Sequence, residues 1–82
     1  MMKEVPIEIA EIYVPARLRP TLDEAKVGAL AEDILENGQQ TAISVRKDKK
    51  RYVLVSGLHR LEACKALGEA TIKAIVVGAP QF

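Results

Sequence analysis

The stretch Tyr52-Val53-Leu54-Val55-Ser56-Gly57-Leu58-His59-Arg60 decides how this chain folds. An apolar, β-branched run reaches Ser56-Gly57, and the residues after it change to helical spacing. The apolar positions that follow predict a helix over residues 58–67, ended by Gly68. The junction is therefore expected to be the start of a helix that follows directly on a buried strand.

The rest of the pattern predicts a small α/β (α+β) protein. The β-branched run Thr71–Val77 predicts a last strand, and the alternation over Val5–Ile9 predicts a first one. Residues 42–45 and 52–55 predict a hairpin around the polar turn Arg46–Arg51. The expected order is strand, helix, hairpin, helix, strand, in a single domain over residues 1–82 with a mixed sheet of about four strands and two helices.

The first helix is expected over residues 22–36. Thr21 would cap it together with Glu24, three residues later. One apolar stripe then faces the sheet, formed by Val27, Leu30, Ala31, Ile34 and Leu35. Residues 12–20, with two prolines, predict an extended connection, and the tail 78–82 is expected to fray. The strand at 52–55 and the strand at 71–77 are expected to form a right-handed parallel crossover.

The strand-to-helix junction carries the chemistry. The first amides of a helix lack intrahelical acceptors, and with the helix dipole they attract anions. Gly57 would let a phosphate approach the backbone closely, while Ser56 adds a hydroxyl. Arg60 offers a planar fork to phosphate oxygens, and His59 a further donor. We expect a phosphate site on residues 56–60, including the Leu58 amide, although a Ser-Gly turn before a helix is also common without any ligand.

The composition and a few single residues bear on nucleic-acid binding, membrane spans, disulfides and metal sites. The net charge of +1 does not by itself indicate nucleic-acid binding, and no apolar run is long enough to span a membrane, so a cytoplasmic protein is expected. Cys64 is the only cysteine and His59 the only histidine, so no disulfide is expected and no metal site is predicted, although a metal site built on carboxylates alone stays open. Cys64 is expected in the core. The acidic residues of the first helix are expected to form a solvated face.

A basic turn offers a separate possibility of contact with DNA. Its residues are Lys47, Lys49, Lys50 and Arg51, and they could touch a phosphate backbone. A charged hairpin tip also serves solubility alone, and both interpretations stay open from the sequence.

The stretch 52–68 resembles the ParB signature, in which an apolar strand runs into Gly-x-x-Arg. Gly57, Arg60, Ala63 and Gly68 match it, and the resemblance covers about residues 5–77. It implies the ParB/sulfiredoxin fold and a nucleotide site, with CTP or ATP as ligand and Mg²⁺ alongside. Arg19, in the connection before the first helix, would assist at the phosphates.

Sulfiredoxins share this fold and carry Gly-Cys-His-Arg at the junction, where they bind ATP. The segment Leu22–Val27 also resembles their helix start, which implies that Lys26, His59 and Arg60 contact phosphates. Leu58 stands where sulfiredoxins have their nucleophilic cysteine, so we expect no sulfiredoxin activity.

The resemblance implies a nucleotide-binding, DNA-associated protein acting in bacterial plasmid partition, transfer or regulation. A small ParB-like DNase, a nucleoside triphosphatase and a non-catalytic interaction module are the alternatives. The sequence names no catalytic residue for any of them. It also leaves open the nucleotide, the DNA site and the oligomeric state.

Overall fold

The computed structural model describes residues 3–78, and its elements follow the predicted order with three additions. β1 (Glu4–Glu8), α1 (Glu24–Asn37), β3 (Ile43–Asp48), β4 (Arg51–Ser56), α2 (Leu58–Ala66) and β5 (Thr71–Val77) are the expected elements. The additions are the 3-10 helices η1 (Ile9–Glu11) and η2 (Ala16–Thr21) and the short strand β2 (Ile12–Tyr13). The α/β class is confirmed, and the tail residues 79–82 lie outside the described part.

The sheet has five strands rather than about four, in the order β1-β5-β3-β4-β2. β5 pairs in parallel with β3, and β4 is antiparallel to β3. β4 and β5 therefore run in opposite directions on either side of β3, and the expected parallel crossover between them is wrong. β2 adds a parallel edge beside β4. Residues 12–20 are thus not simply extended: they form an edge strand and then a 3-10 helix. Pro20 lies inside this short helix, and its missing amide leaves one hydrogen bond of the helix unmade.

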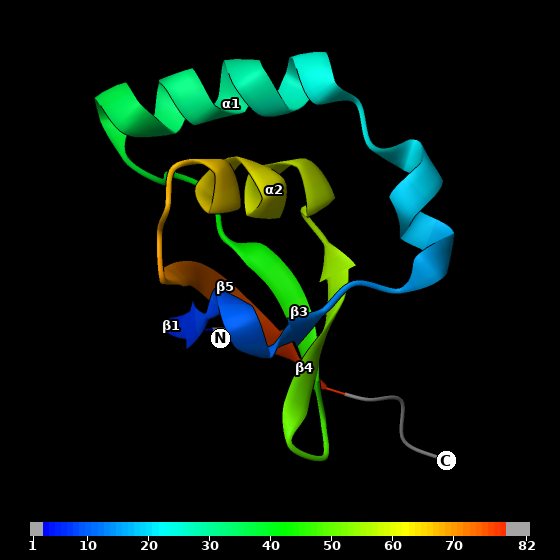
Figure 1. Ribbon diagram of the computed structural model, residues 1–82. Coiled ribbons are helices and arrows are strands. Elements are labelled where there is room, and N and C mark those ends of the chain that lie inside the picture. Colours follow the sequence, from blue (N-terminus) through cyan, green and yellow to red (C-terminus); the bar gives the residue numbers. More distant parts are fainter. Residues whose placement is uncertain (1–2, 79–82) are drawn as a thin grey trace.

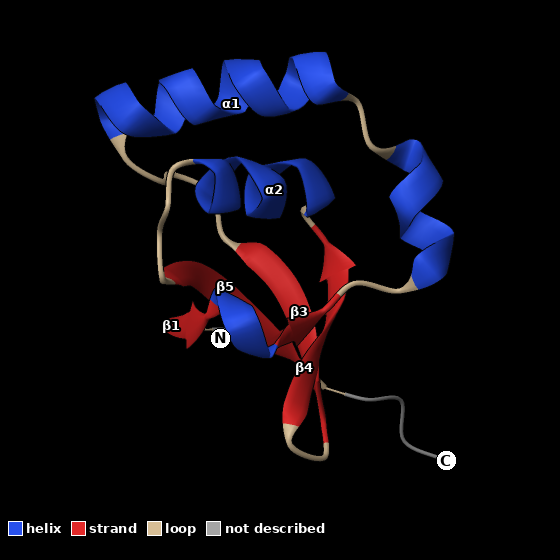
Figure 2. Ribbon diagram, in the orientation of Figure 1, coloured by secondary structure: helices blue, strands red, loops and turns tan. Residues whose placement is uncertain are grey.

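Both α-helices lie on one face of the sheet, with α2 next to the strands and α1 packed across α2 (Figure 1, Figure 2). The core fills the layer between the sheet and α2. Its least exposed large side chains, all with 2% exposure or less, are Ile43, Val45, Leu54, Leu61 and Ile72. Because α2 covers α1 on one side only, Leu35 is 75% exposed, and its placement on the buried stripe was wrong.

The sequence predicted the C-terminal cap of α2 correctly and the N-terminal cap of α1 wrongly. Gly68 takes a left-handed φ of 76° after α2, as expected for a C-terminal cap, and Glu69 N–H donates to Cys64 O. At the start of α1, however, Asp23 is the cap: its carboxylate accepts from the amides of Ala25 and Lys26. The Thr21 hydroxyl instead donates to Leu18 O at 2.6 Å, so the predicted Thr21 capping box is wrong.

The hairpin between β3 and β4 is longer and tighter than expected. The strands continue through Asp48 and resume at Arg51, which leaves only Lys49 and Lys50 in the turn. Lys49 has a φ of 55°, the left-handed conformation that two-residue hairpin turns require and that glycine or asparagine usually supplies. Four of the charged residues, Arg46, Lys47, Asp48 and Arg51, therefore lie in the strands and Lys49 and Lys50 form the turn, in a hairpin that extends beyond the helix layer (Figure 1).

Candidate functional site

The first turn of α2 is open to an anion on its own backbone. Gly57 is the residue that caps α2 and has no side chain to occupy the free amides. Leu61 N–H bonds back to Gly57 O at 2.9 Å, so the three amides before it have no acceptor within the helix. Ser56, the last residue of β4, is exposed immediately before this turn. The expected strand-to-helix junction is present, with its amide donors uncapped.

Gly57 is also required by packing. Its φ is 105°, and a Cβ built on it would lie 2.6 Å from Cγ2 and 2.9 Å from Cβ of Ile43. Residues other than glycine rarely adopt this backbone conformation. The sequence suggested that Gly57 clears space for a phosphate. The structure adds that it lets the first turn of α2 lie against the buried start of β3.

The start of α1 lies beside the start of α2. The backbone N–H of Asp23, the cap of α1, donates to Nε2 of His59 at 3.0 Å. This bond requires Nε2 to be unprotonated, so the ring proton of neutral His59 is on Nδ1. Each helix start carries about half a positive charge. The two helix starts therefore meet at one place on the surface. The Asp23 carboxylate already caps α1 there, whereas the amides of α2 stay free, and Lys26 in the first turn of α1 lies close by.

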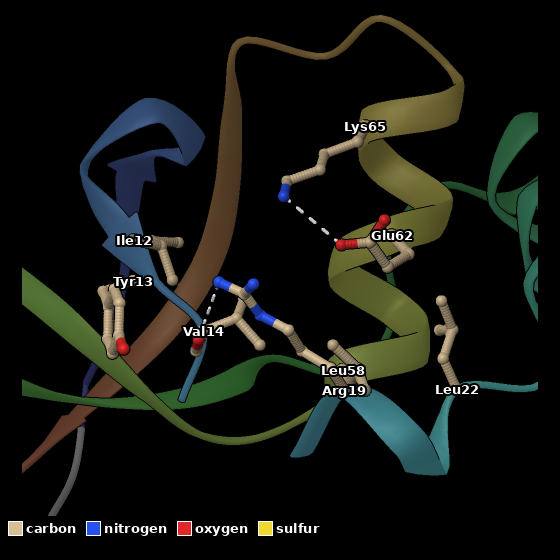
Figure 3. A pocket seen from close by; sticks show the side chains of 8 residues that line it. All are labelled: Ile12, Tyr13, Val14, Arg19, Leu22, Leu58, Glu62 and Lys65. Carbon is tan, nitrogen blue, oxygen red and sulfur yellow. Dashed lines mark hydrogen bonds and ion pairs between the residues drawn. The ribbon is translucent and has the colours of Figure 1, made fainter. Parts of the chain in front are cut away.

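Two hollows flank the first turn of α2. One, of about 410 Å³, lies between β2, η2 and α2. Figure 3 shows Arg19 from η2 and Lys65 from α2 extending into it. Its other lining residues are Ile12, Tyr13, Val14, Leu22, Leu58 and Glu62. The second, of about 370 Å³, lies between the helices and is lined by His59, Lys26, Ala29, Leu30 and Asp33. Leu58 and His59, adjacent in sequence, thus open on different hollows.

The polar groups in the larger hollow are held by short interactions. Arg19 donates from its guanidinium to Val14 O at 3.4 Å, and Lys65 Nζ lies 3.2 Å from a carboxylate oxygen of Glu62. Glu62 is half-buried and Lys65 is exposed. Leu58, Glu62 and Lys65 are spaced i, i+4 and i+7, and this spacing could have placed them on one face.

Arg60 is partly buried, and its Nε is a buried donor with no partner among residues 3–78. A buried donor left unpaired costs about 1–3 kcal/mol, so native structures rarely keep one without a use. Its guanidinium lines neither hollow beside α2. Arg60 thus has free hydrogen-bonding capacity at the anion-attracting end of α2, without a protein partner to satisfy it.

The structure separates the sequence-predicted residues into two groups. Seven surround the first turns of the helices: Arg19, Lys26, Ser56, Gly57, Leu58, His59 and Arg60. The basic residues Lys47, Lys49, Lys50 and Arg51 lie at the hairpin tip, away from the helices (Figure 1). Three participants were not predicted: Glu62 and Lys65, which line the larger hollow, and Asp23, which orients His59 through its backbone amide. No pattern of side chains signals a contact made by a main-chain group.

Cys64 is a core residue, as predicted, with 2% exposure. Burial raises the pKa of its thiol above the ordinary value of 9.0; the nearby charge of Glu69 adds to this and that of Arg60 partly opposes it. A raised thiol pKa makes a thiolate nucleophile scarce near neutrality. The acidic residues of α1 are exposed, and residues 3–78 contain no cluster of three His, Cys, Asp or Glu side chains that could hold a metal ion.

The raised pKa of Cys64 gives a pH prediction. The folded state holds the proton more tightly than the unfolded state, so this contribution to stability is complete below about pH 9 and is lost as pH rises through the higher folded pKa. We expect the free energy of unfolding to fall more steeply between pH 8 and pH 10 in the wild type than in Cys64→Ala. Urea unfolding at both pH values measures this, and equal slopes would contradict it.

Sequence comparison relates nearly the whole chain to one family of proteins. The family model described as ParB N-terminal domain matches residues 2–81. The chain is 35% identical over 71 residues to stage 0 sporulation protein J of Bacillus subtilis, and 37% identical over 71 residues to the probable chromosome-partitioning protein ParB of Campylobacter jejuni. Each match covers 85% of the chain but only about a quarter of the relative, 25% and 26%.

Several solved structures share this fold, and one of them is 30% identical in sequence to this chain. Sulfiredoxin from Arabidopsis thaliana superposes with a TM-score of 0.81 over 96% of this chain and 86% of its own. Caulobacter crescentus ParB, solved with CTP-gamma-S, gives 0.82 at 24% identity, over 96% of this chain and 46% of its own. A free serine kinase with AMP gives 0.77 at 19% identity, over 90% and 30%. The last two show the fold alone. Within residues 3–78, no helix is long and apolar enough for a bilayer.

Proposed function

Because this chain belongs to the ParB N-terminal domain family, we propose that it binds a nucleoside triphosphate at the first turn of α2, within a DNA-associated, partition-type protein. The observation that carries the proposal is the uncapped start of α2, which the Asp23–His59 hydrogen bond joins to the start of α1. Nucleotides accompany relatives of the same fold: CTP-gamma-S in the Caulobacter ParB structure and AMP in the serine kinase.

The phosphates are the part of the ligand that this place attracts. The free amides after Gly57 and the dipole of α2 stabilise negative charge, whereas the Asp23 carboxylate already occupies the start of α1. Arg60 adds a fixed positive charge with an unused Nε donor, and Lys26 adds a second charge from α1. His59 contributes its Nδ1 proton while Nε2 stays bonded to Asp23. Ser56 supplies a hydroxyl at the end of β4.

The hollow beside Leu58 would take the nucleoside. Its volume of about 410 Å³ falls within the ~300–1,000 Å³ of small-molecule sites. Leu22, Leu58 and Tyr13 provide apolar wall, and Arg19 and Lys65 provide donors for ribose, base or phosphate oxygens. CTP and ATP are the two candidates. Mg²⁺ would enter with the phosphates, as it usually does when few carboxylates are available.

The alternatives lack a supporting observation in residues 3–78. A metal-dependent DNase needs a carboxylate or histidine cluster, and none is found among the described residues. Sulfiredoxin chemistry needs a reactive cysteine, whereas Leu58 stands at the junction and Cys64 is buried with a raised thiol pKa. We therefore propose binding, and no hydrolytic step is assigned to any residue.

The proposal is tested by nuclear magnetic resonance titration of the ¹⁵N-labelled chain with CTP, ATP and pyrophosphate, with and without Mg²⁺. Amide shifts are expected at residues 56–60 and 23–26, while amides at the hairpin tip stay in place. The matched variants Lys26→Gln and Lys3→Gln remove one exposed lysine each, and only the first is expected to weaken binding, by about 3- to 10-fold. Absence of shifts at millimolar nucleotide would refute the proposal.

A further inference from the structure

We infer that the tip of the β3–β4 hairpin is a nucleic-acid contact surface that binds the phosphate backbone. Five of the six residues over 46–51 are basic, and the single acid, Asp48, is partly neutralised by Arg51 at 3.6 Å. The chain as a whole has a net charge of only +1. Positive charge is therefore concentrated in one loop instead of being spread over the surface.

The hairpin geometry presents these charges outward. β3 and β4 extend beyond the helices, so the tip projects from the body of the domain at the end opposite α1 (Figure 1). The turn is only two residues long, with Lys49 held at a φ of 55°. The tip encloses a shallow hollow of about 480 Å³, lined by Asp48, Lys49, Lys50 and Arg51. A short turn with a fixed backbone holds the lysines close to one another, at less entropic cost than a flexible loop would incur.

Two tyrosines lie beneath these cations. Lys47 Nζ is 4.4 Å from the centre of the Tyr52 ring, and the Arg51 guanidinium carbon is 4.2 Å from the centre of the Tyr13 ring. Arg51 and Tyr52 are neighbours in β4, so their side chains point to opposite faces of the sheet. Each face of the hairpin thus carries one cation on one aromatic ring, which limits the cation's freedom before any ligand arrives. Tyr13 remains 39% exposed with Arg51 against its ring.

The chemistry of the tip favours nucleic acid over a lipid surface. Binding to an anionic membrane is strengthened by apolar side chains that enter the lipid, and residues 46–51 contain none. Exposed cations beside aromatic rings match a phosphate backbone with accessible bases. The surface reads no sequence, because lysine contacts to phosphate carry no base information.

The experiment is fluorescence anisotropy with labelled 20-nucleotide DNA, single-stranded and duplex, over a range of salt concentrations. Lys49→Glu/Lys50→Glu is compared with Lys3→Glu/Arg17→Glu. Both pairs change the net charge equally, and Lys3 and Arg17 are exposed and lie outside the hairpin, before β1 and in η2. The hairpin pair is expected to lose at least ~10-fold in affinity at low salt and to lower the slope of log affinity against log salt by about 2. The control pair is expected to lose less than ~3-fold.

Three results would overturn the inference. They are no binding by the wild type at low salt, an equal loss in both variant pairs, and binding to phosphatidylserine vesicles without binding to DNA. Circular dichroism of each variant confirms that it is folded. Arg60→Met is expected to retain wild-type DNA binding, so failure at the hairpin is distinguishable from failure at the nucleotide site.

Discussion

Gly57→Ala lowers the free energy of unfolding by about 3 kcal/mol, the largest stability effect that we expect from a single methyl group in this chain. Two costs combine. The backbone at φ 105° disfavours any L side chain, and the new Cβ would lie within 3 Å of two Ile43 side-chain atoms. Ile43 is 1% exposed and cannot move aside freely. For a domain of this size, the loss corresponds to a fall in Tm on the order of 10–20 °C.

Two other glycines separate these costs. Gly68 also has a positive φ, 76°, but a Cβ added there would meet nothing within 4 Å, so Gly68→Ala is expected to lose only about 1 kcal/mol. Gly28, inside α1 and in open space, is expected to gain about 0.5–1 kcal/mol as alanine. Thermal and urea unfolding of the three variants measures this order. Equal losses at Gly57 and Gly68 would show that the Ile43 contact is unimportant.

Arg60→Met is expected to weaken nucleoside triphosphate binding by about 10- to 100-fold without loss of stability. A hydrogen bond to a charged group is worth roughly 1.5–3 kcal/mol, and every 1.4 kcal/mol is tenfold in affinity. Methionine keeps an unbranched apolar stem and removes the buried Nε donor that has no partner among the described residues. Binding falls because the charge is lost, while unfolding should be unchanged or slightly harder.

Isothermal titration with CTP and ATP, together with urea unfolding, measures both effects. Arg60→Lys keeps a positive charge but loses the Nε donor and the planar fork, so its affinity should lie between those of the wild type and Arg60→Met. A methionine variant that is less stable and binds normally would give Arg60 a structural role. That outcome would remove it from the proposed site.

Elements with strong local patterns were predictable. β5 was predicted with its observed bounds because seven residues rich in β-branching have no local alternative. α2 was predicted because its apolar spacing begins at a glycine and ends at a glycine, both of which take positive φ. In each case the decisive information lies within about ten residues.

Features set by distant contacts were not predictable. β2 has only two residues, and it forms because Ile12 and Tyr13 pair in parallel with β4. The strand order depends on β5 choosing β3 as its parallel neighbour, which no local pattern contains. Leu35 fits the apolar stripe of α1, yet α1 rests on another helix and leaves that position in water. The cap of α1 was misjudged because Thr21 and Asp23 are both good capping residues by type.

The candidate site was predictable to the extent that it is made of sequence-local parts. Residues 56–60 form one strand-to-helix junction, so their type and spacing were enough to place them together. The approach of α1 to this junction, through the Asp23 amide and His59, depends on how the helices pack. Arg19 likewise lines the same hollow as Leu58 and Lys65 of α2 only because the chain folds back on itself.

The position of β5 has a consequence for how the chain is made. It is the last of the described strands, yet it lies between β1, the first, and β3. A ribosome would release β1 long before its partner β5 exists, and the open edge of β3 would also wait for β5, for a shorter part of synthesis. Ile7 meets Ile72 only when almost the whole domain has emerged. Throughout that interval the nascent chain carries unpaired strand edges that can pair with another chain, so protection by a chaperone should matter most then.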